Sequence, residues 1–252
     1  MNRIPTFVIN LKSSSDRKRY MESVLSPYQF LDVKYIEAVD GRTMPAREQE
    51  NLFDQNEAYR KYGRVLRCGE IGCTLSHIRC AQEIMKMQTE YALVLEDDLV
   101  IRNGDRLESV LDSLVKSMSP APQVMLLTGD YWYVRLNGIA DDLKVADVWE
   151  AVCSGAYLIN RAAAGIMSQI SPCHLADDWR TIMKAGIAIR AVSPHIADQN
   201  RLDLKTEMTD RYPGKLHRNN MPFVRAVGSM AVSGVSRFLK YIGHFENKDF
   251  VW

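Results

Sequence analysis

The chain has no apolar run that approaches the roughly 20 residues needed to span a bilayer. Its first residues, MNRIPTFVINL, are too briefly apolar for a secretory signal and offer no small-residue cleavage site, so they predict a first strand. The sequence also lacks an excess of one charge, since 32 Lys and Arg face 31 Asp and Glu, for a formal net charge of +1. That balance excludes a strongly basic nucleic-acid-binding protein, and we expect no nucleic-acid partner.

Cysteine is scarce and follows no disulfide pattern. The five cysteines are an odd number and include no CxxC pair, which favours a reducing compartment. Cys73, His77 and Cys80 recur at i, i+4 and i+7, so they share one helical face and form a candidate zinc site. Because cysteine is among the most buried residue types, packing in the core is the favoured interpretation of this face.

What the sequence does contain is a regular alternation of strand and helix patterns up to about Val192. Residues 6–11, 17–25 and 33–39 read as strand, helix and strand, the unit from which parallel sheets are built. A long helical pattern over 70–87 leads directly into a further apolar strand. The 252 residues therefore predict an α/β fold with a mixed, mostly parallel sheet flanked by helices.

The character of the sequence changes after residue 200. We expect residues 1–200 to form the α/β domain and residues 201–252 a C-terminal extension. Between residues 211 and 245 there is no Asp or Glu, while Arg and Lys recur and apolar residues fall on one side of a helical wheel. Such a basic, weakly amphipathic segment predicts peripheral contact with an anionic membrane surface. A helix packed on the domain with its basic face in water is the alternative.

The most informative stretch is YALVLEDDLVI at residues 91–101, in which the apolar run Ala92–Leu95 leads into Glu96, Asp97 and Asp98. Such a run predicts a buried strand, and its carboxyl end lies where open α/β sheets place their ligand crevice. Alternation along the strand predicts that Glu96 and Asp98 point one way and Asp97 the other. Adjacent carboxylates need compensation, for which Mg²⁺ or Mn²⁺ shared with substrate phosphates is the natural candidate. A solvated strand end or a helix N-cap is the simpler alternative.

Several stretches occur in a fixed order and together resemble glycosyltransferase family 25, the lipooligosaccharide and lipopolysaccharide glycosyltransferases of bacteria. The specific part is GEIGCTLSH at residues 69–77 combined with LEDD at 95–98. The resemblance covers roughly residues 6–199. The other matching stretches are FVINL at 7–11, VDG at 39–41, GAYLINR at 155–161 and DDW at 177–179, followed by Pro194 and Gln199.

The resemblance implies a GT-A-like fold and an inverting transfer of a hexose from a nucleotide sugar, most often UDP-galactose. The acceptor would be a sugar of a lipopolysaccharide or lipooligosaccharide, and the protein would act in the cytoplasm or at the inner face of the bacterial inner membrane. A UDP-sugar is then the donor substrate, and Mn²⁺ or Mg²⁺ neutralises the charge that grows on the leaving diphosphate.

The acids and the residues near the first strand receive donor-side roles. Asp98 is the expected metal ligand, with Glu96 as a second, while Glu96 and Asp97 otherwise hold the ribose, the sugar or a metal-bound water. Arg17 is expected to contact the diphosphate, or else to be a surface helix residue. His77 is a donor-side candidate whose alternative is a hydrogen-bonded core histidine. The remaining donor-binding candidates are Asn10, Leu11 and Glu70.

Inversion also needs a base that takes the proton from the acceptor hydroxyl, a role that suits a carboxylate. Asp177 and Asp178 are equal candidates, and Trp179 beside them offers an indole face for a sugar to stack on. The alternative is that these acids cap a helix and that Trp179 is core. Asp130 and Tyr131 are expected to line the acceptor cleft, or to pack a hairpin.

Two other classes of function remain open from the sequence. A metal-dependent phosphodiester hydrolase would use the cluster Glu96–Asp98 and needs a second group of acids, which Asp130 and Asp177 would supply. The near-neutral charge argues against long nucleic-acid substrates for such an enzyme. A non-catalytic nucleotide-sugar-binding protein would bind the donor without turnover, and a structural zinc protein is a weaker variant.

Overall fold

The computed structural model describes residues 3–200 and 244–245. A nine-stranded sheet runs in the order β11-β6-β7-β9-β5-β8-β3-β1-β2, and β10 pairs with β4 in a small second sheet. The strands are β1 (Ile4–Asn10), β2 (Leu31–Glu37), β3 (Tyr91–Glu96), β4 (Leu99–Ile101), β5 (Gln123–Leu126), β6 (Tyr131–Ala140), β7 (Leu143–Ala151), β8 (Ala156–Asn160), β9 (Ala188–Ser193), β10 (Ala197–Gln199) and β11 (His244–Phe245). The helices are α1 (Ser15–Leu25), α2 (Ala46–Leu52), α3 (Gln55–Tyr62), α4 (Cys68–Lys86), α5 (Leu107–Ser117), α6 (Arg161–Met167) and α7 (Trp179–Lys184).

The sheet is mixed, as predicted. β1 pairs in parallel with β2 and β3, and β5 pairs in parallel with β9. Every other neighbouring pair is antiparallel, because β7, β8 and β11 run against the six remaining strands of the nine. Six of the nine strands therefore share one direction, and the predicted α/β fold with a mixed sheet flanked by helices is confirmed.

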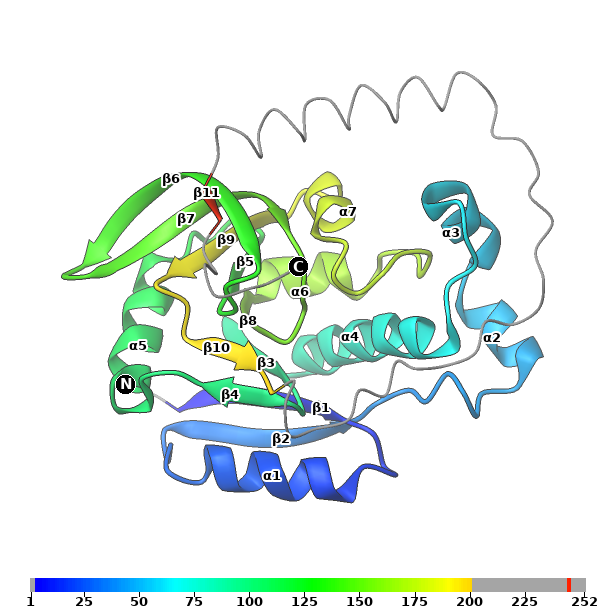
Figure 1. The fold of residues 1–252 in the computed structure, drawn as a ribbon, viewed down its shortest axis with the longest axis horizontal. Helices are drawn as coiled ribbons and strands as arrows, with labels where there is room; N and C mark the ends of the chain where they lie inside the picture. The colour runs from blue at the N-terminus through cyan, green and yellow to red at the C-terminus, as the bar shows by residue number, and fades with distance from the viewer. Residues whose placement is uncertain (1–2, 201–243, 246–252) are drawn as a thin grey trace.

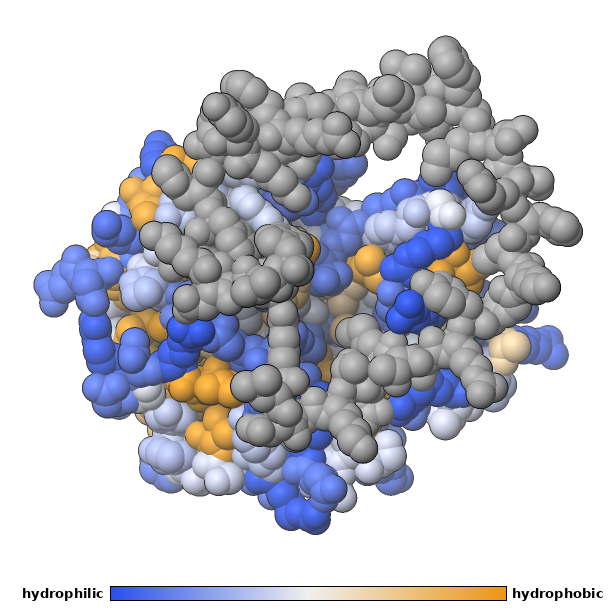
Figure 2. All heavy atoms as spheres, viewed as in Figure 1, coloured by the Kyte–Doolittle hydropathy of each residue, from blue (hydrophilic) through white to orange (hydrophobic). Residues whose placement is uncertain are grey.

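Helices cover both faces of the sheet (Figure 1). Along β1, Phe7 and Ile9 join the core beneath α4 and α6, whereas Val8 joins the core beneath α1 and α5. This alternation is the expected result of a strand that is buried on both faces. On the face seen in Figure 2, the described apolar residues form small groups among hydrophilic ones. No helix within the described residues is both long and apolar enough to cross a bilayer.

The predicted β-α-β opening is confirmed as β1, α1 and β2. The predicted basic segment over residues 211–245 lies outside the described residues, apart from His244 and Phe245. Those two residues form β11, which pairs with Tyr133 and Trp132 of β6, so they are strand where a helical pattern was predicted.

The loop after β2 is docked on the first turns of α4 by close backbone contact. A Cβ atom at Gly72 would overlap the carbonyl oxygen of Val39, and one at Gly41 would overlap the carbonyl oxygen of Cys68. Ser76 strengthens this contact, because its Oγ accepts a hydrogen bond from the Val39 amide at 2.8 Å. The two glycines thus set the distance between the end of β2 and α4.

Substitution of Gly72 by alanine is expected to lower the free energy of unfolding by about 1–3 kcal/mol, because backbone must move to admit the methyl group. The matched control is Gly165→Ala in α6, where the new Cβ would lie 3.7 Å from the Met85 side chain in ordinary contact. That variant is expected to be neutral or more stable by about 0.5–1 kcal/mol, because alanine favours the helix. Urea unfolding of both variants checks the difference, and equal losses of stability would contradict the docking described above.

Candidate active site

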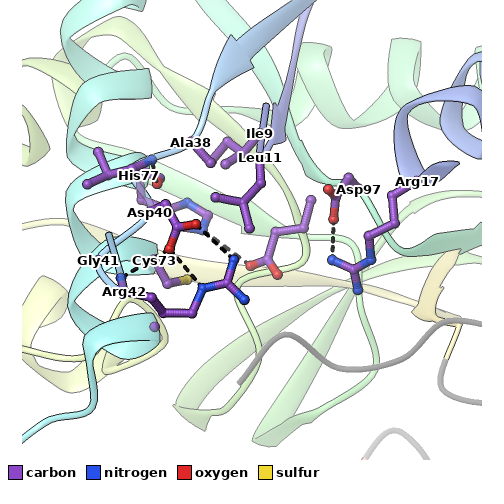
Figure 3. A pocket seen from close by; sticks show the side chains of 14 residues that line it. Ile9, Leu11, Arg17, Ala38, Asp40, Gly41, Arg42, Cys73, His77 and Asp97 are labelled. Atoms are coloured by element: carbon purple, nitrogen blue, oxygen red, sulfur yellow. Dashed lines mark hydrogen bonds and ion pairs between the residues drawn. The ribbon is translucent and has the colours of Figure 1, made fainter. Parts of the chain in front are cut away.

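A pocket opens at the carboxyl ends of β1, β2 and β3, where the sequence predicted a ligand crevice (Figure 3). This edge pocket encloses about 620 Å³, the open solvent at its mouth included. Apolar walls come from the ends of β1 and β2, and polar groups come from α1, α4 and the end of β3. Its lining comprises Ile9, Leu11, Arg17, Ala38, Val39, Asp40, Gly41, Arg42, Gly69, Cys73, Ser76, His77, Glu96 and Asp97.

A second pocket lies beside the first and is rich in carboxylates. This acidic pocket encloses about 770 Å³, again with open solvent included. Cys73 and Glu96 line both pockets, so the two spaces adjoin at these side chains. The acidic pocket is lined by Glu70, Cys73, Glu96, Asp130, Val152, Cys153, Ser154, Leu175, Ala176, Asp177 and Gln199.

Arg17 of α1 bridges two of the three adjacent acids. Its Nη1 donates to Asp97 Oδ1 at 2.6 Å and its Nη2 to Asp98 Oδ2 at 2.8 Å, the first contact being visible in Figure 3. Asn10 donates to the other oxygen of Asp97 at 2.6 Å. A guanidinium therefore compensates these acids within the protein. The predicted contact of Arg17 with a diphosphate stays a prediction: Arg17 lines the edge pocket, and carboxylates engage two of its five N–H groups.

The predicted alternation of the three acids is wrong. β3 ends at Glu96, so Asp97 and Asp98 lie in the turn before β4 and no longer follow the strand period. As a result Asp97 and Asp98 both contact Arg17, whereas Glu96 contacts residues from α4 and from the loop before β8.

Glu96 sits in a hydrogen-bonded cluster at the junction of the two pockets. Its Oε1 accepts from Ser154 Oγ at 2.7 Å and lies 3.2 Å from His77 Nε2. The other ring nitrogen of His77, Nδ1, lies 2.9 Å from the hydroxyl of Tyr157. Burial raises the pKa of Glu96, but the hydrogen bond and charge of His77, with the Ser154 contact, outweigh it and hold this pKa below its usual value.

His77 has features of both roles predicted from the sequence, a core histidine and a residue of the donor side. Its side chain is 3% exposed and hydrogen-bonded, as a core histidine would be, yet it also lines the edge pocket. Ser154 and Tyr157, which position Glu96 and His77, were missed as functional residues. Their only sequence signal is their place at the start of the GAYLIN strand.

Asp98 carries a carboxylate oxygen that no group in the described residues uses. Burial, and next the charge of Glu96, raise the pKa of Asp98 to about 6 despite the nearby Arg17. Its Oδ1 is buried and accepts no hydrogen bond. One open oxygen fits a hard cation that takes its other ligands from substrate phosphates and water. Glu96, the predicted second ligand, places its Oε1 next to His77 and Ser154 instead.

The two candidate bases differ sharply in their surroundings. Asp177 lines the acidic pocket and accepts a long hydrogen bond of 3.4 Å from the Cys153 amide, and burial raises its pKa. Asp178 caps α7 through the Thr181 amide at 3.1 Å and accepts from Tyr62 Oη at 2.5 Å. It also forms an ion pair with Lys61 at 2.5 Å. Asp177 therefore faces a pocket, whereas Asp178 caps a helix.

The pKa of Asp178 agrees with this structural role. Burial raises its pKa, but the hydrogen bonds from Lys61, Tyr62 and Thr181 outweigh that effect and lower it below the ordinary value. The catalytic role that the sequence left open for Asp178 is thus replaced by the alternative, a helix cap.

Two predicted acceptor-binding aromatics belong to the core instead. Trp179 is 1% exposed, donates through Nε1 to the Cys153 carbonyl at 3.1 Å, and packs edge-on against Tyr157 with ring centroids 5.6 Å apart. Tyr131 is fully buried and donates to the Val192 carbonyl at 2.6 Å. Neither ring presents a face to a sugar, because both side chains are almost completely buried.

The other predicted residues divide between the two pockets. Leu11 lines the edge pocket, and Asn10 acts on it indirectly by holding Asp97. Asp130 is 6% exposed and lines the acidic pocket, and its acceptor role stays a prediction.

Glu70 was predicted on the donor side but lines the acidic pocket. There it forms a bidentate pair with Arg64 at 2.8 Å and accepts from the Arg67 amide at 2.7 Å, closing the first turn of α4. Burial raises its pKa, but the Arg64 and Arg67 contacts outweigh burial and lower it.

The hydrolase alternative required Asp130 or Asp177 to join the cluster Glu96–Asp98. Only Glu96 shares a pocket with them, while Asp98 is held by Arg17. The described arrangement therefore gives no paired-metal group of acids around Asp98.

The family model for glycosyltransferase family 25, described as an LPS biosynthesis protein, matches residues 3–140. The chain belongs to glycosyltransferase family 25. Procollagen galactosyltransferase 2 of Homo sapiens is 38% identical over 96 residues, which are 37% of this chain and 15% of that protein. A glycosyltransferase of Acanthamoeba polyphaga mimivirus is 32% identical over 155 residues, 60% of this chain and 43% of that protein. The chain thus spans less than half the length of these relatives.

Comparison with solved structures gives distant likenesses. A mannose-1-phosphate geranyltransferase from Thermus thermophilus aligns over 79% of this chain and 76% of its own, with 12% identity and a TM-score of 0.42. A glycosyltransferase involved in glycosylation of the major capsid of PBCV-1 aligns over 66% and 63%, with 12% identity and a TM-score of 0.34.

Replacing Asp178 by asparagine is expected to lower the free energy of unfolding at pH 7 by about 1–3 kcal/mol, through loss of charged hydrogen bonds. Because the folded pKa of Asp178 lies below the ordinary 3.8, its stabilisation is present above that value and disappears as the pH falls through the folded pKa. Thermal unfolding at several pH values checks this trend.

The neighbouring variant Asp177→Asn is the matched control. The pKa of Asp177 is raised, so its ionised form costs stability above pH 3.8, and the asparagine variant is expected to be at least as stable as the wild type at pH 7. Equal destabilisation by both substitutions would contradict the division of roles between these acids.

Proposed function

We propose that the chain transfers a hexose, galactose from UDP-galactose being the first candidate, to a hydroxyl of a saccharide acceptor with inversion at the transferred carbon. One observation carries the proposal: two pockets adjoin at Glu96, one at the carboxyl edge of the sheet and one containing Asp177. A transfer between two bound substrates needs two such sites that meet where the bond is exchanged. Membership of glycosyltransferase family 25 supports the same reaction class.

The edge pocket suits the nucleotide sugar. Leu11, Ala38 and Val39 offer apolar contact for a base, and Arg42, which is paired with Asp40 at 2.8 Å, adds a basic group to the lining. A cation would be held by Asp98 through its Oδ1, which is buried and has no hydrogen-bond partner among the described residues. When Mn²⁺ or Mg²⁺ is bound, it neutralises charge on the leaving diphosphate. Arg17 holds Asp97 and Asp98 in place while the diphosphate leaves.

The acidic pocket suits the acceptor. Asp177 takes the proton of the acceptor hydroxyl as that oxygen bonds to the anomeric carbon and the bond to the diphosphate breaks. Its raised pKa makes it a stronger base than an ordinary aspartate, and the hydrogen bond that its carboxylate accepts from the Cys153 amide is long, at 3.4 Å. Asp130 is placed to accept a hydrogen bond from another acceptor hydroxyl.

The names of the relatives support the finer assignment of substrates. The family description refers to LPS biosynthesis, and the animal relatives are named as procollagen galactosyltransferases. We therefore take a lipopolysaccharide or lipooligosaccharide sugar as the acceptor to test first, with the protein in the cytoplasm or at the inner face of the bacterial inner membrane.

Calorimetry with UDP-galactose, UDP-glucose and a UDP-N-acetylhexosamine, with and without Mn²⁺, is expected to reveal one donor that binds in the presence of metal. Asp98→Ala is expected to weaken that binding at least about tenfold, which is roughly 1.4 kcal/mol. Asp142→Ala is the control, because Asp142 is an exposed acid paired with Arg106 away from both pockets. Failure of every UDP-sugar to bind the wild type with metal present would refute the proposed donor.

Asp177→Asn is expected to lower kcat by a factor of about 10² to 10⁴ and leave donor affinity unchanged, because it removes a base and not a donor contact. In the wild type, activity is expected to fall as the pH drops through a pKa above the ordinary 3.8, since only ionised Asp177 accepts the proton. The variant is expected to lose this acidic limb. Asp130→Asn is the comparison, and a larger kcat loss there than in Asp177→Asn would move the base assignment to Asp130.

A further inference from the structure

We propose that Cys73, His77 and Glu96 form a site for a soft divalent cation of the zinc class, at the junction of the edge and acidic pockets. The Cys73 sulfur, a His77 ring nitrogen and a Glu96 carboxylate oxygen all lie within 4.8 Å of one another. The cation would be distinct from the hard cation assigned to Asp98.

The fold brings these three ligands together from two elements. Cys73 and His77 are four residues apart on α4, so they lie on one face of the helix. Glu96 is the last residue of β3 and meets that face, with its Oε1 3.2 Å from His77 Nε2. Zinc–ligand bonds of about 2.0–2.3 Å in a tetrahedron separate ligand atoms by roughly 3.2–3.7 Å. The three ligand atoms lie within 4.8 Å of one another, so the widest separation has to shorten by up to about 1 Å when a cation binds.

Cys80 takes no part in this site. The sequence grouped it with Cys73 and His77, but Cys80 is fully buried in the core, whereas Cys73 lines both pockets. Glu96 is the third ligand in place of Cys80, which the helical spacing had suggested. Glu96 comes from β3, and the helical periodicity of the sequence cannot show that this strand approaches α4.

The surrounding contacts resemble those that support metal ligands. His77 Nδ1 is held by the Tyr157 hydroxyl at 2.9 Å, and the two rings stack with centroids 5.7 Å apart. This leaves Nε2 directed at Glu96, whose Oε1 is held in turn by Ser154 at 2.7 Å. Ligating histidines and carboxylates commonly have such outer hydrogen bonds, which fix the ring and the ligand atom. The Tyr157 hydroxyl can donate or accept, so it can follow a change of tautomer at His77.

The ligand types select the metal. A thiolate and an imidazole favour zinc over Mg²⁺ or Mn²⁺, which prefer oxygen ligands. On binding, the Cys73 thiol releases its proton to solvent and the sulfur coordinates as a thiolate. Three protein ligands leave a fourth position for water, as in zinc sites that are open to solvent.

If the proposed function holds, a cation at this site lies where it would affect the rate of transfer. Cys73 and Glu96 line both pockets and His77 lines the edge pocket. A cation with its water would stand where the donor and the acceptor must meet. Zinc is therefore expected to inhibit transfer, while Mn²⁺ at Asp98 supports it.

The first test measures zinc alone on the full chain, stripped of metal and without substrates. One equivalent of Zn²⁺ is expected to bind the wild type, and Cys73→Ser is expected to weaken that binding at least tenfold. Cys68→Ser is the matched control, since Cys68 begins the same helix but stands outside the cluster. With Co²⁺ as the probe, the wild type and Cys68→Ser are expected to show thiolate-to-cobalt absorption that Cys73→Ser lacks. Zinc binding that is absent, or equal in all three proteins, would overturn the site.

The second test measures transfer with Mn²⁺ fixed and Zn²⁺ increased, each protein being compared with its own rate without zinc. Inhibition is expected in the wild type and Cys68→Ser at zinc concentrations that fill the site, and at least tenfold higher concentrations are expected for Cys73→Ser. Zinc that binds through Cys73 without inhibiting transfer would overturn the placement of the site between the substrates. Because the first test uses no sugar donor, it stands or falls independently of the proposed function.

Discussion

The bridge from Arg17 to Asp97 and Asp98 is the contact on which the arrangement of the crevice depends. Three adjacent carboxylates at the end of a buried strand repel one another. The planar guanidinium of Arg17 compensates two of them, because separate N–H groups donate to Asp97 and Asp98. The Arg17 side chain is 14% exposed, so solvent screens the interaction little. Asn10 adds the end of β1 to the same contact. Three segments, β1, α1 and the turn after β3, are thereby fixed to one another. Loss of the arginine would leave buried charges unpaired, at a typical cost of about 3–5 kcal/mol.

A second set of contacts connects the walls of the two pockets. Glu96 meets His77, His77 meets Tyr157, and Tyr157 packs against Trp179, which donates to the Cys153 carbonyl. Each of the aromatic members is almost fully buried. Packed rings and directed hydrogen bonds leave these groups little rotational freedom. Trp179, which the sequence favoured for stacking on a sugar, instead supports the site by packing against Tyr157.

The sequence predicts those parts of this molecule that follow from local rules. The β-α-β opening and the position of Glu96 at a sheet edge follow from apolar runs and the geometry of parallel strands. The orientation of Asp97 and Asp98 failed because it required knowing that β3 stops at Glu96. The environment of Asp178 failed because Lys61 and Tyr62 reach it from α3, more than a hundred residues earlier.

The different surroundings of the adjacent Asp177 and Asp178 likewise cannot be predicted from sequence patterns. Both are aspartates before a helix, and only tertiary contacts make one a cap and leave the other in a pocket. Arg17 shows the same limit. A basic residue after a first strand is compatible with phosphate contact, and its actual partners lie 80 and 81 residues away.

The reversal of β8 has a consequence for how chemical groups can be gathered at one edge of a sheet. In a purely parallel sheet, only segments that leave strands reach the carboxyl edge. Here β8 runs against β3 and β5, and the Glu96 amide donates to the Gly155 carbonyl at 2.7 Å. The segment that enters β8 therefore reaches the same edge and delivers Ser154 to Glu96. Side chains from the end of β3 and from the segment before β8 therefore lie next to each other at this edge. An antiparallel strand thus brings additional side chains to the crevice without a further strand in the sheet.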